Sequence, residues 1–268
     1  MPTHRSVRHA VLEYFKEHGR AHLPWRKTTK AYRILVSEIM LQQTQVDRVM
    51  PFYKNFLKQF PTPAVLSQAP LSDVLKAWSG LGYNRRAKFL HEAAKAMVMR
   101  HKGKVPQGYD ELRALPGVGE YTAKAVRVFA HNEPEVLIET NVRTVIIHHY
   151  FQKQAHVSEP ALLDIATHLA AGQDPRTWHG ALMDYGTHLK ATHGNLSRKS
   201  ALYTNQKPFK GSLREVRGAI LKVLHRGAAT QSSLKKALPH DLHDRFDAAL
   251  LQLQKEGLIT KDKGTFRT

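Results

Sequence analysis

The sequence predicts a mostly α-helical chain in which prolines separate helices of ordinary length. Apolar residues recur at helical spacing over 71–78 and 161–169, and alternating, strand-like runs are few. Prolines such as Pro51, Pro106 and Pro134 are expected to mark breaks between helices. With 268 residues the chain can bury one large core or two smaller ones.

The charge balance indicates a polyanionic partner. The chain carries 41 Lys and Arg against 22 Asp and Glu, a formal net charge of +19, which exceeds what solubility requires. Nucleic acid fits this balance best. A basic membrane-surface protein is the alternative, but no stretch approaches the roughly 18–20 apolar residues of a spanning helix. We expect a soluble, monomeric, cytoplasmic protein that does not bind membranes and is nucleoid-associated if the source is bacterial.

The last quarter of the chain is expected to form a separate basic module. Residues 192–212 are polar, basic and weakly periodic, which is typical of a linker. From residue 198 onward the chain holds 15 Lys and Arg against 6 Asp and Glu. Residues 213–268 follow winged-helix order, with three helical segments and then two short strand-like runs around a Lys-Gly turn. A small helical cap with a solvated basic face is the alternative.

The segment LPGVGEYTAKAV, Leu115 to Val126, places two glycines between a proline and an alanine-rich helix. An ordinary helix-to-helix turn needs one glycine at most, so Gly117 and Gly119 indicate that something approaches the backbone closely. That neighbour is either another part of the chain or a phosphate held on exposed amides at a helix N-terminus. The excess positive charge favours the phosphate.

A carboxylate falls among core residues in the segment 34–49. Ile34 and Leu41 define an apolar helical stripe, and Glu38 lies on the same face, with Gln42 one turn further on. Burial of this carboxylate is costly unless it is paired or stays protonated, and a general acid needs the proton. The alternative is a glutamate at the rim of the core that is bonded to a backbone amide.

A second carboxylate, Glu139, follows an apolar run and precedes a helix that begins with Thr140 and Asn141. The positive end of the helix dipole is expected to keep this carboxylate ionised. Two carboxylates in opposite environments can divide acid and anion roles, as in glycoside hydrolysis. Ordinary helix capping is the alternative for Glu139.

Six motifs occur in the order and at the spacing found in one enzyme family. They are LPWR (23–26), SEIMLQQTQV (37–46), WSGLGYNRRA (78–87), LPGVGEYTA (115–123), ETNVR (139–143) and ALMDYG (181–186). The chain therefore resembles the helix-hairpin-helix DNA glycosylases of the endonuclease III superfamily, most closely the branch that acts on mismatched adenine. The resemblance implies an all-α, two-lobed core over 1–191, with a central lobe at about 30–130 and a second lobe from 1–29 plus 131–191. A linker at 192–212 and a winged-helix-like domain at 213–268 follow.

The resemblance also implies roles for single residues. Glu38 is similar to the acid that protonates a ring nitrogen of the flipped adenine, and Gln42 to the glutamine inserted beside the extruded nucleotide. Tyr83 is similar to the tyrosine wedged beside the opposite base, and base flipping needs such a plug. The remaining DNA contacts are expected at the hairpin and at four basic side chains: Gly117, Val118, Gly119, Arg85, Arg86, Arg198 and Lys199.

Tyr121 stands where bifunctional relatives carry the lysine that forms a Schiff base with the sugar, which tyrosine cannot form. Lys124, one helical turn later, could offer its amine in place of that lysine, but its position on the helix places the amine at a different height in the cleft. Glu139 departs from the aspartate typical of the family, which moves the charge by roughly a bond length. Asn141 keeps its place and can orient the carboxylate.

Two further departures concern cofactor and tail. Family members usually follow MDYG with four cysteines, but the corresponding positions are Lys190, Ser197, Ser200 and Gln206, and the chain contains no cysteine. We expect no iron–sulfur cluster, no metal site and no other cofactor. Adenine glycosylases that detect oxidised guanine read it with a β-rich C-terminal domain, and the tail does not resemble that domain. The resemblance therefore does not assign the base opposite the adenine.

The sequence thus predicts a monofunctional DNA N-glycosylase of base excision repair. Its expected substrate is double-stranded DNA with a mismatched base, most simply adenine opposite guanine or oxoguanine. The catalytic residues assigned are Glu38, Glu139, Tyr121 and Asn141. A thymine or uracil glycosylase acting opposite guanine and a non-catalytic DNA-binding protein remain the alternatives.

Overall fold

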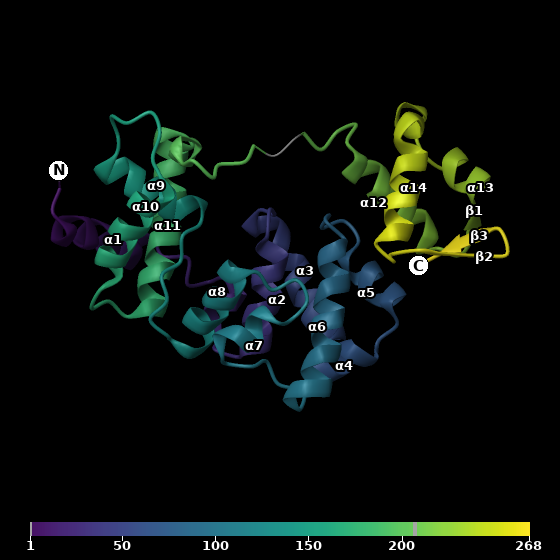
Figure 1. Ribbon diagram of the computed structural model, residues 1–268, viewed down its shortest axis with the longest axis horizontal. Helices are drawn as coiled ribbons and strands as arrows, with labels where there is room; N and C mark the ends of the chain where they lie inside the picture. Colours follow the sequence, from purple (N-terminus) through teal and green to yellow (C-terminus); the bar gives the residue numbers. More distant parts are fainter. Residues whose placement is uncertain (1, 206–207) are drawn as a thin grey trace. The chain divides into compact units, whose positions relative to one another are not determined.

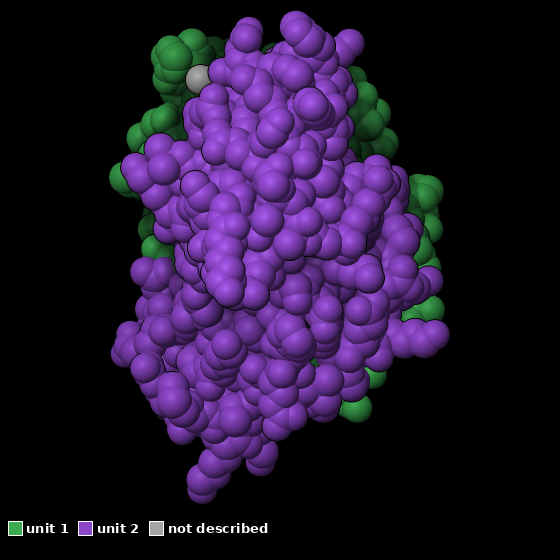
Figure 2. Space-filling view, turned by 90° about the vertical axis from the view of Figure 1, so that its right-hand side faces the viewer, with its two compact units in different colours: residues 1–35, 119–205 green, residues 36–118, 206–268 purple. Residues whose placement is uncertain are grey.

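The computed structural model describes residues 2–205 and 208–268, and these are mainly helical, as predicted (Figure 1). The chain divides into two compact units, which Figure 2 colours separately. Unit 1 comprises residues 1–35 and 119–205, and unit 2 comprises residues 36–118 and 206–268. Among the described residues, no helix is long and apolar enough to cross a membrane.

Unit 1 is built around two helices, α9 and α11, that pack along each other. Its elements are α1 (His4–His18), η1 (Pro24–Lys27), the start of α2 (Ala31–Leu41), α8 (Glu120–His131), α9 (Thr140–Tyr150), α10 (Glu159–Ala170), α11 (Pro175–His193) and η2 (Leu196–Lys199). The side chains of Thr3, Ser158 and Asp174 cap α1, α10 and α11 by accepting first-turn amides. The core that the helices enclose is apolar and includes Val11, Ile146, Leu162 and Trp178.

The central helices of unit 2 follow the rest of α2. They are α3 (Val46–Gln59), α4 (Pro63–Gln68), α5 (Leu71–Trp78), α6 (Arg85–His101) and α7 (Tyr109–Arg113), and α6 packs against α4 and α5. The expected break at Pro51 is wrong, because Pro51 lies inside α3. The proline removes one backbone hydrogen bond, and burial of Tyr53 and Phe56 holds the helix together beyond it.

The tail has the winged-helix order that the sequence predicts. It contains α12 (Leu213–Leu224), β1 (Ala229–Thr230), α13 (Gln231–Lys236), η3 (His240–Arg245), α14 (Phe246–Lys255), β2 (Thr260–Asp262) and β3 (Thr265–Arg267). The three strands form one antiparallel sheet in the order β1-β3-β2. Lys263 and Gly264 both have positive φ in the turn between β2 and β3, as a two-residue hairpin requires.

The units partition the chain differently from the lobes inferred by resemblance. Helix α8 belongs to unit 1, where it packs against α11, although the central lobe was expected to extend to about residue 130. The tail groups with the central helices in unit 2. One contact between them joins Lys88 Nζ on α6 to the carbonyl oxygen of Glu256 at 2.6 Å.

Candidate active site and DNA interface

Glu38 lies on α2 among core residues. Its side chain is 9% exposed, and Leu35, Ile39 and Met40 around it on the helix are 0–1% exposed. A carboxyl that exchanges a proton with a substrate must be held in a fixed place away from bulk water, and α2 provides such a placement.

Gln42 directly follows the helix that carries Glu38 and is not part of it. Helix α2 ends at Leu41, and Gln43 turns the chain with a left-handed φ of 56°. The backbone amide of Thr44 donates to the Leu41 carbonyl at 3.1 Å, which closes the turn before α3. Gln42 therefore stands in a turn directly after the helix of Glu38.

Tyr83 lies in the loop between α5 and α6, just before Asn84, the N-cap of α6. Gly80, Gly82 and Tyr83 all have positive φ, at 101°, 81° and 49°. The side chain of Arg48 donates to the Gly80 carbonyl, and Trp78 Nε1 donates to the Gly82 carbonyl at 3.1 Å. A tyrosine at positive φ is uncommon and persists where its surroundings hold it. The loop thus presents the tyrosine ring in a fixed position.

The glycines of the hairpin have separate explanations. Gly117 has a φ of 77°, and a Cβ there would lie 2.7 Å from the Cβ of Phe89 on α6. The chain's own packing therefore requires this glycine. Gly119 caps α8, and both glycines are exposed. Val118 differs, because its side chain is buried and its amide donates to the Leu115 carbonyl at 3.1 Å, so this amide serves the turn instead of a phosphate.

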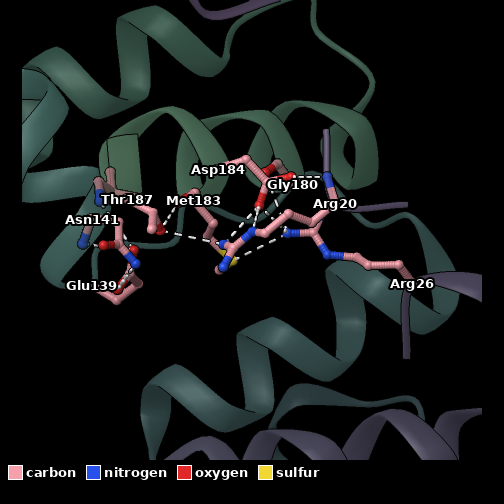
Figure 3. Close-up of polar contacts among 9 residues, drawn as sticks. Arg20, Arg26, Glu139, Asn141, Gly180, Met183, Asp184 and Thr187 are labelled. Atoms are coloured by element: carbon pink, nitrogen blue, oxygen red, sulfur yellow. Dashed lines mark hydrogen bonds and ion pairs between the residues drawn. The ribbon is translucent and has the colours of Figure 1, made fainter. Parts of the chain in front are cut away.

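Glu139 is the N-cap of α9. Its Oε1 accepts the backbone amides of Asn141 at 2.8 Å and Val142 at 3.0 Å, and its Oε2 accepts Asn141 Nδ2 at 3.2 Å (Figure 3). Burial raises the pKa of the Glu139 carboxyl, and the amide hydrogen bonds offset only part of this rise. The carboxyl therefore takes up a proton at a higher pH than an ordinary glutamate does.

The glycine of the ALMDYG motif sets the distance between α11 and the start of α9. A Cβ on Gly186 would lie 2.3 Å from the carbonyl oxygen of Asn141 and 2.7 Å from its Cβ. Glycine is thus the residue that lets α11 approach the segment carrying Glu139 and Asn141. Tyr121 lies in the first turn of α8 and is half-buried.

Asp184 of the same motif anchors the N-terminal LPWR segment within unit 1 (Figure 3). Its buried carboxylate accepts the backbone amide and Nε of Arg20, each at 2.8 Å, and Arg26 Nη2 at 3.4 Å. A Cβ on Gly180 would lie 2.1 Å from Arg26 Nη1, so glycine makes room for this guanidinium. These two motifs are therefore parts of one structural network.

The loop after α11 is held by polar side chains. Ser200 Oγ donates to Glu159 Oε1 at 2.5 Å, and Glu159 Oε2 pairs with Arg143 Nη2 at 2.8 Å. Ser197 is buried, and its Oγ donates to Asn195 Oδ1 at 2.6 Å. Ser200 thus bonds the loop to Glu159 on α10, and Glu159 in turn pairs with Arg143 on α9.

Of the four cluster positions, Ser200 bonds to Glu159 and Ser197 bonds within the loop, while Lys190 lies on α11 and Gln206 lies outside the described residues. Arg198 is exposed, whereas Lys199 Nζ donates to the Gln152 carbonyl at 2.8 Å and so serves the loop. Within residues 2–205 and 208–268, no group of three or more His, Asp or Glu side chains could hold a metal ion.

Five residues assigned to DNA in the sequence analysis, together with residues of the tail, line one cavity of about 350 Å³ in unit 2. The lining residues are Gln42, Gln43, Tyr83, Asn84, Arg85, Arg86, Phe89 and Gly117 from the central helices and Arg214, Arg217 and Glu256 from the tail. Arg214 donates to the Tyr83 hydroxyl, and its guanidinium lies 5.0 Å from the centroid of the tyrosine ring. These tail residues were not predicted from the sequence, because no local pattern ties them to Tyr83.

Comparisons with known proteins place the chain in a family. The HhH-GPD superfamily of base excision DNA repair proteins matches residues 36–165. An adenine DNA glycosylase of Mycolicibacterium smegmatis is 34% identical over 279 residues, an alignment that covers 95% of this chain and 93% of that protein. The chain belongs to the HhH-GPD superfamily of base excision DNA repair proteins.

Two further similar proteins extend the comparison. An adenine DNA glycosylase of Buchnera aphidicola subsp. Baizongia pistaciae is 40% identical over 140 residues, which cover 52% of this chain and 40% of that protein. The solved structure of a thermostable thymine-DNA glycosylase matches with a TM-score of 0.61 and 28% identity, over 68% of this chain and 85% of that one. Glu38, the hairpin and Glu139 all fall inside the segment that matches the HhH-GPD superfamily.

Proposed function

We propose that the chain is a monofunctional glycosylase that hydrolyses the N-glycosidic bond of a mismatched adenine flipped out of double-stranded DNA. The observation that carries the choice of adenine is the end-to-end similarity to an adenine DNA glycosylase. The net charge of +19 and the exposed glycines of the hairpin support DNA as the partner.

The two glutamates would divide the chemistry. Glu38 gives its proton to a ring nitrogen of adenine, which makes the base a better leaving group. As the bond breaks, positive charge develops on the sugar, and the Glu139 carboxylate stabilises it. Water then adds to the sugar carbon, and its surplus proton leaves to solvent or to a carboxylate. Asn141 orients Glu139 through the hydrogen bond to Oε2.

The absence of a lysine at Tyr121 supports hydrolysis without strand cleavage, because a Schiff base needs an amine. Lys124 is a poor substitute, since its Nζ is paired with Glu120 Oε1 at 2.7 Å. We therefore expect no covalent adduct when the protein and a mismatched duplex are treated with borohydride. An adduct that forms with the parent and disappears in Lys124→Ala would contradict the monofunctional assignment and identify the amine.

We also propose that the protein works without an iron–sulfur cluster. The donor set at the corresponding positions contains no thiolate, and Ser197 and Ser200 are engaged in hydrogen bonds with Asn195 and Glu159. Ser200→Ala should free Glu159 from one hydrogen bond and lower the melting temperature by a few degrees, by the rule of about 1 kcal/mol for a hydrogen bond. Iron bound stoichiometrically to protein purified under anaerobic conditions would contradict the proposal.

The spacing set by Gly186 gives a further prediction. Gly186→Ala should shift the start of α9 and lower single-turnover excision by about tenfold or more, because small misplacements of catalytic groups are costly. Gly218→Ala on α12 is the matched control, since no atom lies within 4 Å of the added Cβ. Equal excision rates for the two variants would show that the contact with Asn141 does not position Glu139.

Excision of thymine or uracil opposite guanine is the second candidate, and the similarity to a thymine-DNA glycosylase structure favours it. A panel of duplexes with A:G, A:oxoguanine, T:G and U:G mismatches, with A:T as control, separates the two. The released base is identified by mass, and strands are examined before and after alkali. We expect free adenine and breaks only after alkali, whereas release of thymine or uracil alone would select the second candidate.

A further inference from the structure

Arg86 is a buried arginine whose hydrogen bonds go to two separate turns. Only 8% of the residue is exposed. Its Nη1 donates to the carbonyl oxygens of Ile39 at 3.0 Å, Met40 at 2.8 Å and Gln42 at 2.6 Å, at the end of the helix that carries Glu38. Carbonyl groups at a helix C-terminus lack intrahelical partners, and a cation there satisfies them.

The other side of the guanidinium binds the loop that carries Tyr83. Nη2 donates to the Gly82 carbonyl at 3.0 Å and to Thr44 Oγ1 at 3.1 Å, and Nε donates to the Tyr83 carbonyl at 3.4 Å. The guanidinium also lies 5.3 Å from the centroid of the Tyr83 ring. One side chain therefore connects the backbone of Gln42 with the backbone of Tyr83.

Both turns contain residues that need such support. Gln43 and Tyr83 hold left-handed φ values of 56° and 49°, which cost free energy in residues other than glycine. Removing the guanidinium would leave several carbonyl groups at this buried place without their donor. Burial lowers the pKa of Arg86 to about 10, so the side chain stays charged near neutral pH.

We propose that Arg86 is the positioning residue that fixes Gln42 relative to Tyr83, so that the two side chains can enter the base stack together when a nucleotide is extruded. It is not a phosphate contact, because its donors are already engaged with the protein. The inference rests on the proposed function and on the resemblance to the family, which implies that Gln42 lies beside the extruded nucleotide and Tyr83 beside the base opposite it.

Arg85, the preceding residue, supplies the contrast. It is exposed, and its guanidinium lies 4.8 Å from the centroid of the Phe89 ring at the surface of the cavity. A side chain that contacts phosphate contributes about one unit to the slope of log affinity against log salt concentration. Arg85→Gln should lower this slope by about one, whereas Arg86→Gln should leave it unchanged.

The decisive experiment measures base extrusion and excision in the full-length protein. Extrusion is followed by the fluorescence of 2-aminopurine placed as the target base opposite guanine, and excision of adenine is followed in single turnover. Arg86→Lys keeps the charge but cannot reach both turns with one ammonium group. We expect it to lower extrusion and excision by about 10- to 100-fold, with Arg86→Gln lower still and duplex affinity kept. Arg100→Lys, an exposed arginine on the same helix, is the matched control.

The possible results distinguish a positioning role of Arg86 from a phosphate contact. If Arg86→Lys folds with the parental melting temperature and extrudes and excises like the parent, the positioning role is wrong. If Arg86→Gln lowers the salt slope by one while extrusion stays normal, Arg86 is a phosphate contact. If the parent extrudes 2-aminopurine but excises no base from any duplex, the proposed function fails, and loss of extrusion in Arg86→Lys still supports the positioning role.

Discussion

Glu38→Gln should bind a mismatched duplex as the parent does and excise adenine more slowly by roughly 10²–10⁴-fold, the range for a lost general acid. Gln has nearly the same shape as Glu, so the buried site on α2 is kept while the transferable proton is removed. The measurement is a single-turnover time course with protein in excess, beside duplex affinity in the same buffer. Glu13→Gln, an exposed residue of α1, is the charge-matched control. An unchanged rate would remove Glu38 from the mechanism.

Glu139→Gln should abolish most excision, by roughly 10²–10³-fold, because the carboxylate that stabilises the cationic sugar is lost. Duplex affinity should stay the same or improve, since the substitution removes a negative charge from a DNA-binding protein. The amide side chain can still accept the backbone amides of Asn141 and Val142, so the helix cap survives. The Gln variant therefore distinguishes the role of the Glu139 negative charge from the role of Glu139 as the N-cap of α9.

Glu139→Asp tests whether the site is built for glutamate. The longer side chain reaches both amides of α9 and leaves Oε2 for Asn141, so shortening it should lower excision. A gain of activity would show that the site is still shaped for aspartate. If Gln and Asp both excise at the parental rate, Glu139 is a helix cap only.

The raised pKa of Glu139 predicts the acid limb of the pH–rate profile. The anion is lost as pH falls through this pKa, and because burial raises it, excision should begin to fall at a higher pH than for an ordinary glutamate. The residual activity of Glu139→Gln should lack this limb. An identical acid limb in both proteins would assign it to another group.

Much of the fold is visible in the sequence because it depends on local patterns. Helical spacing predicted the helices, and the Lys-Gly turn with its flanking runs predicted β2 and β3 in the tail. The motif LPGVGEYTA predicted a turn with special glycines. Pro51 was predicted to interrupt a helix but lies inside α3, because the packing of Tyr53 and Phe56 outweighs the local effect of the proline.

The site was less predictable wherever long-range contacts decide a residue's role. Arg85 and Arg86 are neighbours of the same type, yet one is exposed and the other is buried among carbonyl groups of two turns. Nothing local distinguishes them. Likewise, Arg214 bonds to Tyr83, which lies 131 positions earlier in the sequence. Lys199 donates to the Gln152 carbonyl, a contact that no local pattern predicts.

The proposed function requires that this protein breaks the N-glycosidic bond of a mismatched adenine. The direct test incubates excess parent protein with a duplex that contains one adenine opposite oxoguanine and measures the moles of free adenine per mole of duplex after one turnover. The proposed function predicts close to one mole of adenine, with the strand intact until alkali is added. Tight binding of the duplex with no free base, from this or any other mismatch, would contradict it and favour a DNA-binding protein that has kept the fold.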